Sequence, residues 1–166
     1  KLRGETVRVI PNEHPRGLCG ARNTGVAASE GEVIAFLDDD AIPAADWVER
    51  LGSAYADPAV MGVGGAVRPR WLEGRPRWFP AEYDWVVGCT HSGMPSEPAP
   101  VRNPVGANMS FRRRVLVELG GFRDQLGRVG SNTAGAEETD LCIRAHQRWP
   151  EQTILFEPAA VVEHVV

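Results

Sequence analysis

The sequence predicts an α/β domain in which a mixed, mainly parallel sheet carries helices on both faces. Apolar runs of strand length and amphipathic helical patterns alternate in the order strand, helix, strand, helix, strand up to residue 67. Such alternation favours parallel strands joined by crossover helices that cover the sheet. The chain has 166 residues, which is enough for one domain with a sizeable core. We therefore expect a single domain over residues 1–166.

The composition argues against some kinds of binding partner and some kinds of structure. A formal net charge of −4 offers no electrostatic basis for binding nucleic acid. Cys19, Cys89 and Cys142 lack paired spacing, so we expect buried free thiols in a reducing compartment. The sequence holds no apolar run of membrane-spanning length. Because it begins at Lys1 without Met and ends in two valines, we expect it to be a piece of a longer protein.

The first elements are a short strand and a glycine-containing helix. Residues 7–10 favour a strand that ends at Pro11, and residues 20–29 favour a helix that ends before Gly31. Its glycines weaken this helix in isolation, so we expect packing against the sheet to stabilise it. Arg22 lies near its start, where a solvated arginine is, without further context, a better interpretation than a phosphate contact.

The central strand ends in three consecutive carboxylates. Residues 33–37 are all apolar and predict a short strand buried on both faces, and Asp38, Asp39 and Asp40 follow directly. Adjacent carboxylates at a strand end repel one another unless a cation or hydrogen-bond donors lie among them. Ligands of open α/β sheets bind at this end of the strands. The triplet is suited to binding Mg²⁺ or Mn²⁺ together with phosphate oxygens. An acidic surface turn explains the three aspartates equally well.

A long irregular segment follows the next helix and strand. Residues 45–56 predict the helix, residues 60–67 the buried strand, and residues 68–103 a proline-rich insert that is typical of a functional region. Aromatic residues and arginines alternate in the insert, which suits stacking on a sugar and recognition of its hydroxyls. The alternative is that the rings plug the edge of the sheet, and we favour it for Trp71 and Trp85.

The second half predicts, in order, a strand, a helix, a glycine-rich loop, a long helix and two strands. These elements are residues 105–111, 115–119, 127–135, 136–149, 154–156 and 161–165. We expect the loop to be mobile, because nothing in its sequence supports it internally.

Two acidic residues open the long helix. Glu137 and Glu138 lie in its first turn, where the helix dipole favours negative charge. Dipole matching alone would explain them, yet a turn that follows a glycine-rich loop is also a good position for a general base. Asp140 and Arg144 have the i, i+4 spacing of an ion pair. His164 is a single histidine on an apolar strand, which by itself is more typical of a structural residue.

In this order the segments resemble the inverting nucleotide-sugar glycosyltransferases of family 2, which have the Rossmann-like GT-A fold. The resemblance covers nearly the whole chain, and no single block of it is specific. Its blocks are residues 21–25, 36–40, 106–113 with 120–122, and 137–141 with Arg144. It implies a GT-A catalytic domain that lacks the family's first strand and helix, which would precede Lys1.

The resemblance implies roles for the residues of the donor site. The aspartate triplet matches the family's DxD motif, with Asp40 on the metal and with Asp38 and Asp39 on the ribose or base side. His164 stands where relatives carry a histidine near the metal, which implies a second ligand. Arg22 becomes a contact of the donor.

The resemblance also assigns the sugar side and the base. Gly106, Ala107 and Asn108 would line the donor sugar. Glu137 and Glu138 stand where the family usually has Glu-Asp, so Glu138 is the implied base. Its side chain is one methylene longer than the family's aspartate, which leaves open which of the two carboxylates acts.

The implied activity is a metal-dependent inverting transfer with Mn²⁺ or Mg²⁺ as cofactor. The donor would be a nucleoside-diphosphate sugar and the acceptor a glycan, a lipid or a small molecule. The implied location is cytoplasmic, at the inner face of the membrane if parts outside this sequence associate with it peripherally.

Two other functions fit the same residues. One is a catalytically silent GT-A domain that binds a glycan or a partner protein. The other is a nucleotidyltransferase, which also uses carboxylates and a metal, although the sequence shows no glycine-rich phosphate loop with a lysine.

Overall fold

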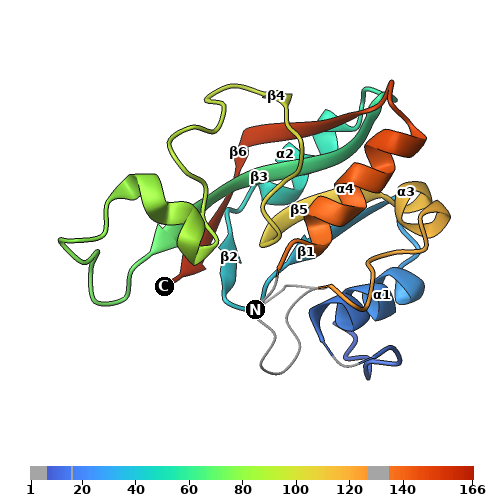
Figure 1. Ribbon diagram of the computed structural model, residues 1–166, viewed down its shortest axis with the longest axis horizontal. Coiled ribbons are helices and arrows are strands. Elements are labelled where there is room, and N and C mark those ends of the chain that lie inside the picture. Colours follow the sequence, from blue (N-terminus) through green and yellow to red (C-terminus); the bar gives the residue numbers. More distant parts are fainter. Residues whose placement is uncertain (1–6, 16, 127–134) are drawn as a thin grey trace.

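The protein is built on a six-stranded sheet, and its computed structural model describes residues 7–15, 17–126 and 135–166 (Figure 1). Five strands lie in the order β1-β5-β3-β6-β2, and β4 pairs with β6 outside this path. Their bounds are Val33–Leu37 (β1), Ala41–Pro43 (β2), Val60–Arg70 (β3), Ala99–Pro100 (β4), Asn108–Arg112 (β5) and Thr153–Val165 (β6).

Helices cover both faces of this sheet. The α-helices are Leu18–Ala28 (α1), Trp47–Ala54 (α2), Arg113–Glu118 (α3) and Glu137–Arg148 (α4), and Ala81–Val87 forms a 3₁₀ helix (η1). Side chains of α1, α3 and α4 share one hydrophobic cluster, and those of α2 belong to another. The α/β class and the helices on both faces are confirmed.

The directions of the strands differ in part from the prediction. Strands β1, β3 and β6 run the same way, but β5 lies antiparallel between β1 and β3. Among the described strands only β3 and β6 pair in parallel, so the expectation of mainly parallel neighbours is wrong. Alternating strand and helix patterns predict the direction of successive strands, but they cannot reveal that a later strand inserts between them.

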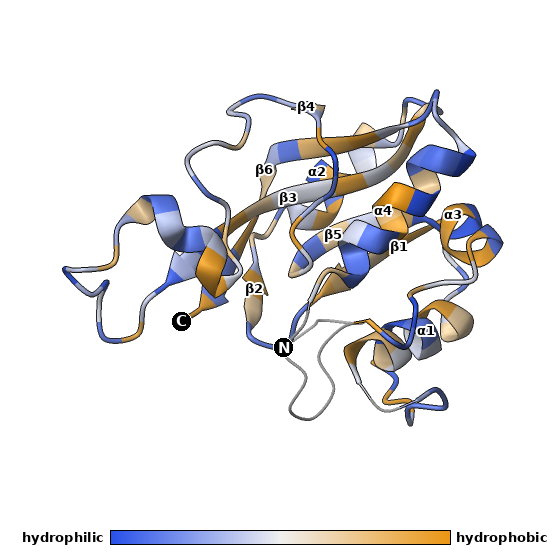
Figure 2. Ribbon diagram, viewed as in Figure 1, coloured by the Kyte–Doolittle hydropathy of each residue, from blue (hydrophilic) through white to orange (hydrophobic). Residues whose placement is uncertain are grey.

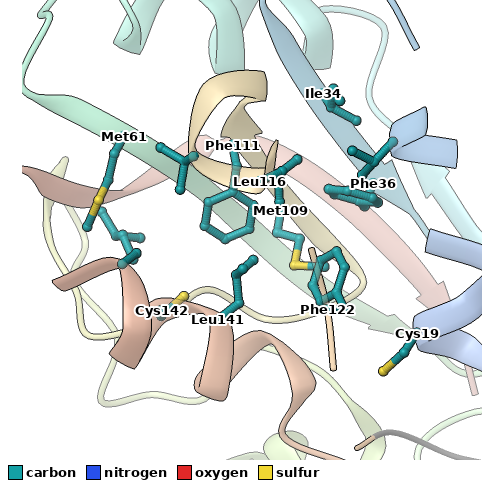
Figure 3. Close-up of a cluster of buried hydrophobic side chains, with 14 residues drawn as sticks. Cys19, Ile34, Phe36, Met61, Met109, Phe111, Leu116, Phe122, Leu141 and Cys142 are labelled. Atoms are coloured by element: carbon teal, nitrogen blue, oxygen red, sulfur yellow. The ribbon is translucent and has the colours of Figure 1, made fainter. Parts of the chain in front are cut away.

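The larger core lies between the sheet and helix α4. Phe111 and Met109 of β5 are fully buried and face Leu141 and Cys142 of α4 (Figure 3). Phe122 closes the cluster, with its ring in edge contact with Phe36 at a centroid distance of 5.4 Å. This packing fixes α4 against β5, and therefore also fixes where the first residues of α4 lie.

A smaller core lies on the opposite face under α2. Trp47 and Leu51 pack on Val63 of β3 and on Ala160 and Val162 of β6. Apolar residues recur along β3 and β6, the two long strands that both cores share (Figure 2). At Gly62, a Cβ would come within 2.6 Å of the Phe111 ring, so glycine there lets β5 approach β3 closely.

Three predicted elements need correction. Residues 7–10 form no strand; they are exposed, and Arg8 donates a hydrogen bond to the Ala28 carbonyl instead. Strand β1 is buried on one face only, because α2 lies over β3 and β6 rather than over β1. The two strands predicted at the end are one continuous strand, β6, in which a register shift against β3 replaces the expected turn.

Two other regions bear on predictions. The loop predicted at residues 127–135 lies, apart from Gly135, outside the described residues. None of the helices in the described part of the chain combines the length and the apolarity needed to cross a bilayer.

Candidate active site

A cavity of about 1100 Å³ collects most of the residues that the sequence singled out. It is bordered by helix α1, the end of β1, the segment before β5, the start of α4, the end of β6 and η1. The predicted site residues that line it are Arg22, Asp38, Gly106, Ala107, Glu137, Glu138 and His164. The end of β1 and the first turn of α4 therefore face one common cavity.

Arg22 is a buried cation in the cavity wall, and it contacts three other parts of that wall. Only 7% exposed, it donates to Glu137 Oε1 over 2.6 Å through Nη1. Its Nη2 donates to Asp38 Oδ1 over 3.3 Å and to the Gly106 carbonyl over 3.2 Å. The guanidinium also lies over the ring of Phe122, 5.5 Å from its centroid. Protein groups thus engage both terminal nitrogens of the guanidinium, so Arg22 ties α1, β1 and α4 together.

Glu137 and Glu138 have different surroundings although they are adjacent. Consecutive helical side chains point about 100° apart, so the two carboxylates leave the first turn of α4 in different directions. Glu137 is 4% exposed, and its carboxylate accepts the short bond from Arg22. The ion pair with Arg22 therefore holds the Glu137 carboxylate in position.

Glu138 lines the cavity, and none of the described Arg or His side chains forms an ion pair with it. Burial raises the pKa of its carboxyl, and the neighbouring charge of Glu137 adds to the rise. Its one side-chain hydrogen bond among the described residues comes from its neighbour Thr139, at a long 3.4 Å. A half-buried, weakly solvated carboxylate of this kind is a suitable proton acceptor.

The three aspartates after β1 separate in space. Asp38 turns toward Arg22 and the cavity, Asp39 is exposed, and Asp40 turns toward His164. Strand β2 begins at Ala41, which pairs with His164 of β6, and this register brings Asp40 beside the histidine. The Val165 amide also donates to the Asp40 carbonyl over 3.0 Å.

Asp40 and His164 lie side by side and carry atoms of the types that bind metal ions. His164 Nε2 lies 3.2 Å from Asp40 Oδ1, and on the other side of the ring Cys89 Sγ lies 3.9 Å from Nδ1. In the described ranges no three His, Cys, Asp or Glu side chains gather as a complete metal site. Mg²⁺ and similar ions are often held by one or two protein ligands, with substrate phosphates and waters completing the shell. The pair therefore fits a divalent cation that arrives with a diphosphate.

Asn108 lies in the core, not on the cavity wall. Fully buried, it accepts a hydrogen bond from Trp47 Nε1 at 2.9 Å and donates to the carbonyls of Ala66 and Ala160. These bonds join β5, β3, β6 and α2, and they use the polar atoms of its side chain. Gly106 and Ala107 lie before this strand, and both border the cavity.

The insert contributes lining residues that the sequence did not single out. Glu82 and Trp85 of η1 both border the cavity, and Trp85 is 59% exposed. The expectation that Trp85 plugs the sheet edge is therefore wrong. Trp71, by contrast, is half-buried and packs on Phe79 with a centroid distance of 5.4 Å. The i, i+3 spacing of Glu82 and Trp85 was the available signal, but it has meaning only once a 3₁₀ helix is known to form.

Two sequence comparisons identify proteins that are similar to this chain. The family model described as glycosyl transferase family 2 matches residues 1–120. Over 151 residues the chain is 38% identical to the glucosyl-dolichyl phosphate glucuronosyltransferase of Haloferax volcanii, an alignment that covers 90% of this chain. That alignment covers 48% of the relative, so this chain spans about half of its length.

Solved structures of similar shape are also found. A crystal structure of GalNAc-T7 with UDP, GalNAc and Mn²⁺ matches with a TM-score of 0.65 and 19% identity, over 93% of this chain and 31% of that one. The mannosyltransferase PcManGT from Pyrobaculum calidifontis, in complex with GDP-Man and Mn²⁺, matches with a TM-score of 0.61 and 22% identity, over 92% of this chain and 37% of that one. At these identities the likeness establishes the fold.

Proposed function

Because this chain belongs to glycosyl transferase family 2 and has the GT-A fold that its sequence predicted, we propose that it is an inverting glycosyltransferase. The donor is a nucleoside-diphosphate sugar, and the acceptor carries a free hydroxyl. The observation that carries the proposal is the separation of the two adjacent carboxylates at the start of α4. Both border the cavity, but Glu137 is held in a buried ion pair with Arg22, whereas Glu138 forms no ion pair with a described residue.

Glu138 is the base in this proposal, and Glu137 positions it. Glu137 is held by Arg22 over 2.6 Å, so its Oε1 atom already accepts a hydrogen bond from the guanidinium. Glu138 has a raised pKa and forms no ion pair with a described residue, so it can take a proton from a bound hydroxyl. The longer glutamate side chain thus acts at the position where the family usually has aspartate.

The transfer is a single displacement. Glu138 accepts the hydroxyl proton while the acceptor oxygen forms a bond to the anomeric carbon of the donor sugar. The bond from that carbon to the phosphate oxygen breaks, and the nucleoside diphosphate leaves with the electron pair. Because nucleophile and leaving group occupy opposite sides of the carbon, the configuration inverts.

The other predicted site residues hold the donor. Asp40 and His164 would hold Mn²⁺ or Mg²⁺, which when bound supplies positive charge to the diphosphate. Asp38 and Asp39 lie on the side of the nucleoside. Gly106 and Ala107 border the donor sugar, whereas we assign Asn108 a structural part because its polar atoms bond within the core.

Arg22 is a positioning residue in this account rather than a ligand of the donor. Its contacts with Asp38, Gly106 and Glu137 place three parts of the cavity wall relative to one another. A displacement of catalytic groups by about 1 Å can slow a reaction strongly. The buried ion pair of Arg22 should therefore affect turnover through the positions of these groups.

The relatives suggest candidate substrates. The Haloferax volcanii protein is named for a glucosylated dolichyl phosphate, and the two solved structures hold UDP and GDP-Man. We therefore propose a UDP or GDP sugar as donor and a glycoside, free or lipid-linked, as acceptor. A catalytically silent domain would bind the nucleotide without transferring sugar.

Calorimetric titration with UDP, GDP and TDP, with and without Mn²⁺, tests the donor site. We expect Mn²⁺ to tighten binding of one nucleotide, and Asp40→Asn to abolish that gain. Even changes to the partners of metal ligands cost about 10–100-fold in affinity, so the expected loss is at least about tenfold. Asp46→Asn is the control, because Asp46 is half-exposed and pairs only with Arg50. Metal-independent binding that Asp40→Asn leaves unchanged would contradict the assignment.

A further inference from the structure

Helix η1 presents three rows of side chains. In a 3₁₀ helix, residues three apart eclipse one another, so Ala81–Val87 divides into rows with a spacing of three. Asp84 and Val87 belong to the row that packs inward. Glu82 and Trp85 form the next row, and both border the cavity that contains Glu138.

The row of Glu82 and Trp85 is held firmly although it is exposed. Arg75 grips the buried Asp84 with two bonds, of 2.7 Å and 2.8 Å, and its guanidinium also lies over the Trp71 ring. Gly88 ends the helix with a left-handed φ of 74° and donates to the Trp85 carbonyl. In Figure 1 this green segment protrudes beyond the end of β3, beside the C-terminus. The Trp85 backbone is therefore positioned before any ligand binds, which lowers the entropic cost of binding.

The chemistry of this row fits a pyranose ring. Trp85 offers an aromatic face that is 59% exposed, and the axial C–H face of a pyranose is the apolar surface that suits it. Glu82 offers a carboxylate to the hydroxyls at the rim of the ring, and bonds of hydroxyls to a carboxylate are the strong, charge-assisted kind. A nucleotide base could also stack on Trp85, but the aspartates proposed for the donor lie at the end of β1.

We propose that Glu82 and Trp85 form an acceptor subsite that binds the terminal pyranose of a glycoside. The inference rests on the proposed function, since it names the acceptor of that same cavity. The cavity of about 1100 Å³ lies just above the range of about 300–1000 Å³ that is usual for a pocket holding one small molecule. The sugar bound there places its hydroxyl within the cavity that Glu138 borders.

Saturation-transfer NMR of the protein with a panel of methyl pyranosides tests the subsite. The panel holds both anomers of glucose, galactose and mannose, with Mg²⁺ and either UDP or GDP present. We expect at least one glycoside to bind and Trp85→Ala to weaken it about tenfold, as truncated tryptophans at binding sites commonly do. Trp78→Ala is the matched control, because Trp78 lies in the same insert, is 80% exposed and is absent from the residues described as lining the cavity.

Each result of this experiment has a fixed meaning. Equal loss with Trp85→Ala and Trp78→Ala, or no binding of any glycoside by the unaltered protein, overturns the subsite. Retention of binding by Trp85→Phe, with weaker binding by Glu82→Gln, supports stacking and hydroxyl recognition. Octyl glycosides alongside methyl glycosides separate a lipid-linked acceptor from a free one, because only the former gains from the alkyl chain.

A kinetic measurement separates this proposal from the function itself. Trp85→Ala should raise the KM for the acceptor about tenfold while leaving nucleotide affinity unchanged. If the nucleotides fail to bind in calorimetry, the proposed function fails. If they bind and the acceptor KM does not change, the subsite alone fails.

Discussion

The two walls of the cavity formed by α4 and by η1 are built in opposite ways. At the start of α4, Arg22 and Glu137 are both under a tenth exposed, and they join three elements of the core. On η1, Trp85 is mostly exposed, and its helix is fastened to the insert through Arg75 and Asp84. The first wall is part of the folded core, whereas the second is an attachment at the end of the sheet.

This difference separates chemistry from recognition. A change to Arg22 or Glu137 must disturb folding, because both groups are buried and Arg22 pairs with Glu137 and Asp38. A change at the η1 wall can alter what binds and leave the core intact, since Trp85 and Glu82 contact solvent. On the roles proposed for these residues, the reaction depends on the core and the choice of acceptor depends on the exposed row of η1.

The largest expected effect comes from Glu138→Gln. General base catalysis typically contributes about 10²–10⁴-fold, so transfer should fall by that factor while nucleotide affinity is retained. Rates of sugar transfer and calorimetric titration with nucleotide measure the two quantities. Glu151→Gln is the control, because Glu151 is exposed. Unchanged turnover in Glu138→Gln would contradict the assignment of Glu138 as the base.

The next largest effect is on stability and comes from Arg22→Ala. Loss of one partner of a buried ion pair leaves an uncompensated charge, here Glu137, and costs about 3–5 kcal/mol. Urea denaturation monitored by tryptophan fluorescence measures the free energy of unfolding. Arg50→Ala removes an arginine from a surface ion pair with Asp46 and should change little. Comparable losses in the two variants would show that the α4 wall is not embedded in the core.

The pH dependence of transfer tests the environment of Glu138. The pKa of Glu138 is raised mainly by burial, so the acid limb of kcat/KM should be centred above the ordinary glutamate value of about 4.3, with activity falling about tenfold per pH unit below it. An acid limb at the ordinary value would show that the base is a solvated carboxylate.

The same pKa shift bears on stability. The folded state binds the proton of the Glu138 carboxyl more tightly than the unfolded state does. Protonation of Glu138 therefore stabilises the fold fully below the unfolded-state pKa, and this stabilisation is lost as pH rises through the folded-state pKa. At neutral pH, Glu138→Gln should therefore keep or raise the melting temperature, which thermal unfolding can measure.

The smallest expected effect comes from Arg75→Ala on the η1 wall. Without Arg75, Asp84 loses its two hydrogen bonds and η1 loses part of its fixed orientation. We expect the acceptor KM to rise about a few-fold, through the lost pre-organisation, with kcat nearly unchanged. Urea stability should fall, because Asp84 is buried, but by less than in Arg22→Ala, because the Arg75 side chain is 33% exposed and water can partly replace it. A loss of stability equal to that of Arg22→Ala would mean that both walls belong to the core.

Much of the fold could be predicted from local sequence patterns. The apolar run before Asp38 forms β1, and the acidic turn before Leu141 opens α4, because hydrophobic periodicity and helix-start signals act over neighbouring residues. The juxtaposition of Asp38 with Glu137 and Glu138 came from the resemblance to the family, and their shared cavity agrees with it. The direction of β5 and the single buried face of β1 depended on partners far along the chain, and those predictions failed.

The sequence by itself determined the alternation of strands and helices, the acidic turn after Leu37 and the pair of glutamates at 137 and 138. Only the tertiary structure decided which of the two glutamates is held by Arg22, since that depends on how α4 is rotated against β5. It also turned Asn108 into the core and Trp85 out of it. Local patterns act through neighbouring residues, whereas burial and ion pairing depend on residues that only the folded chain brings together.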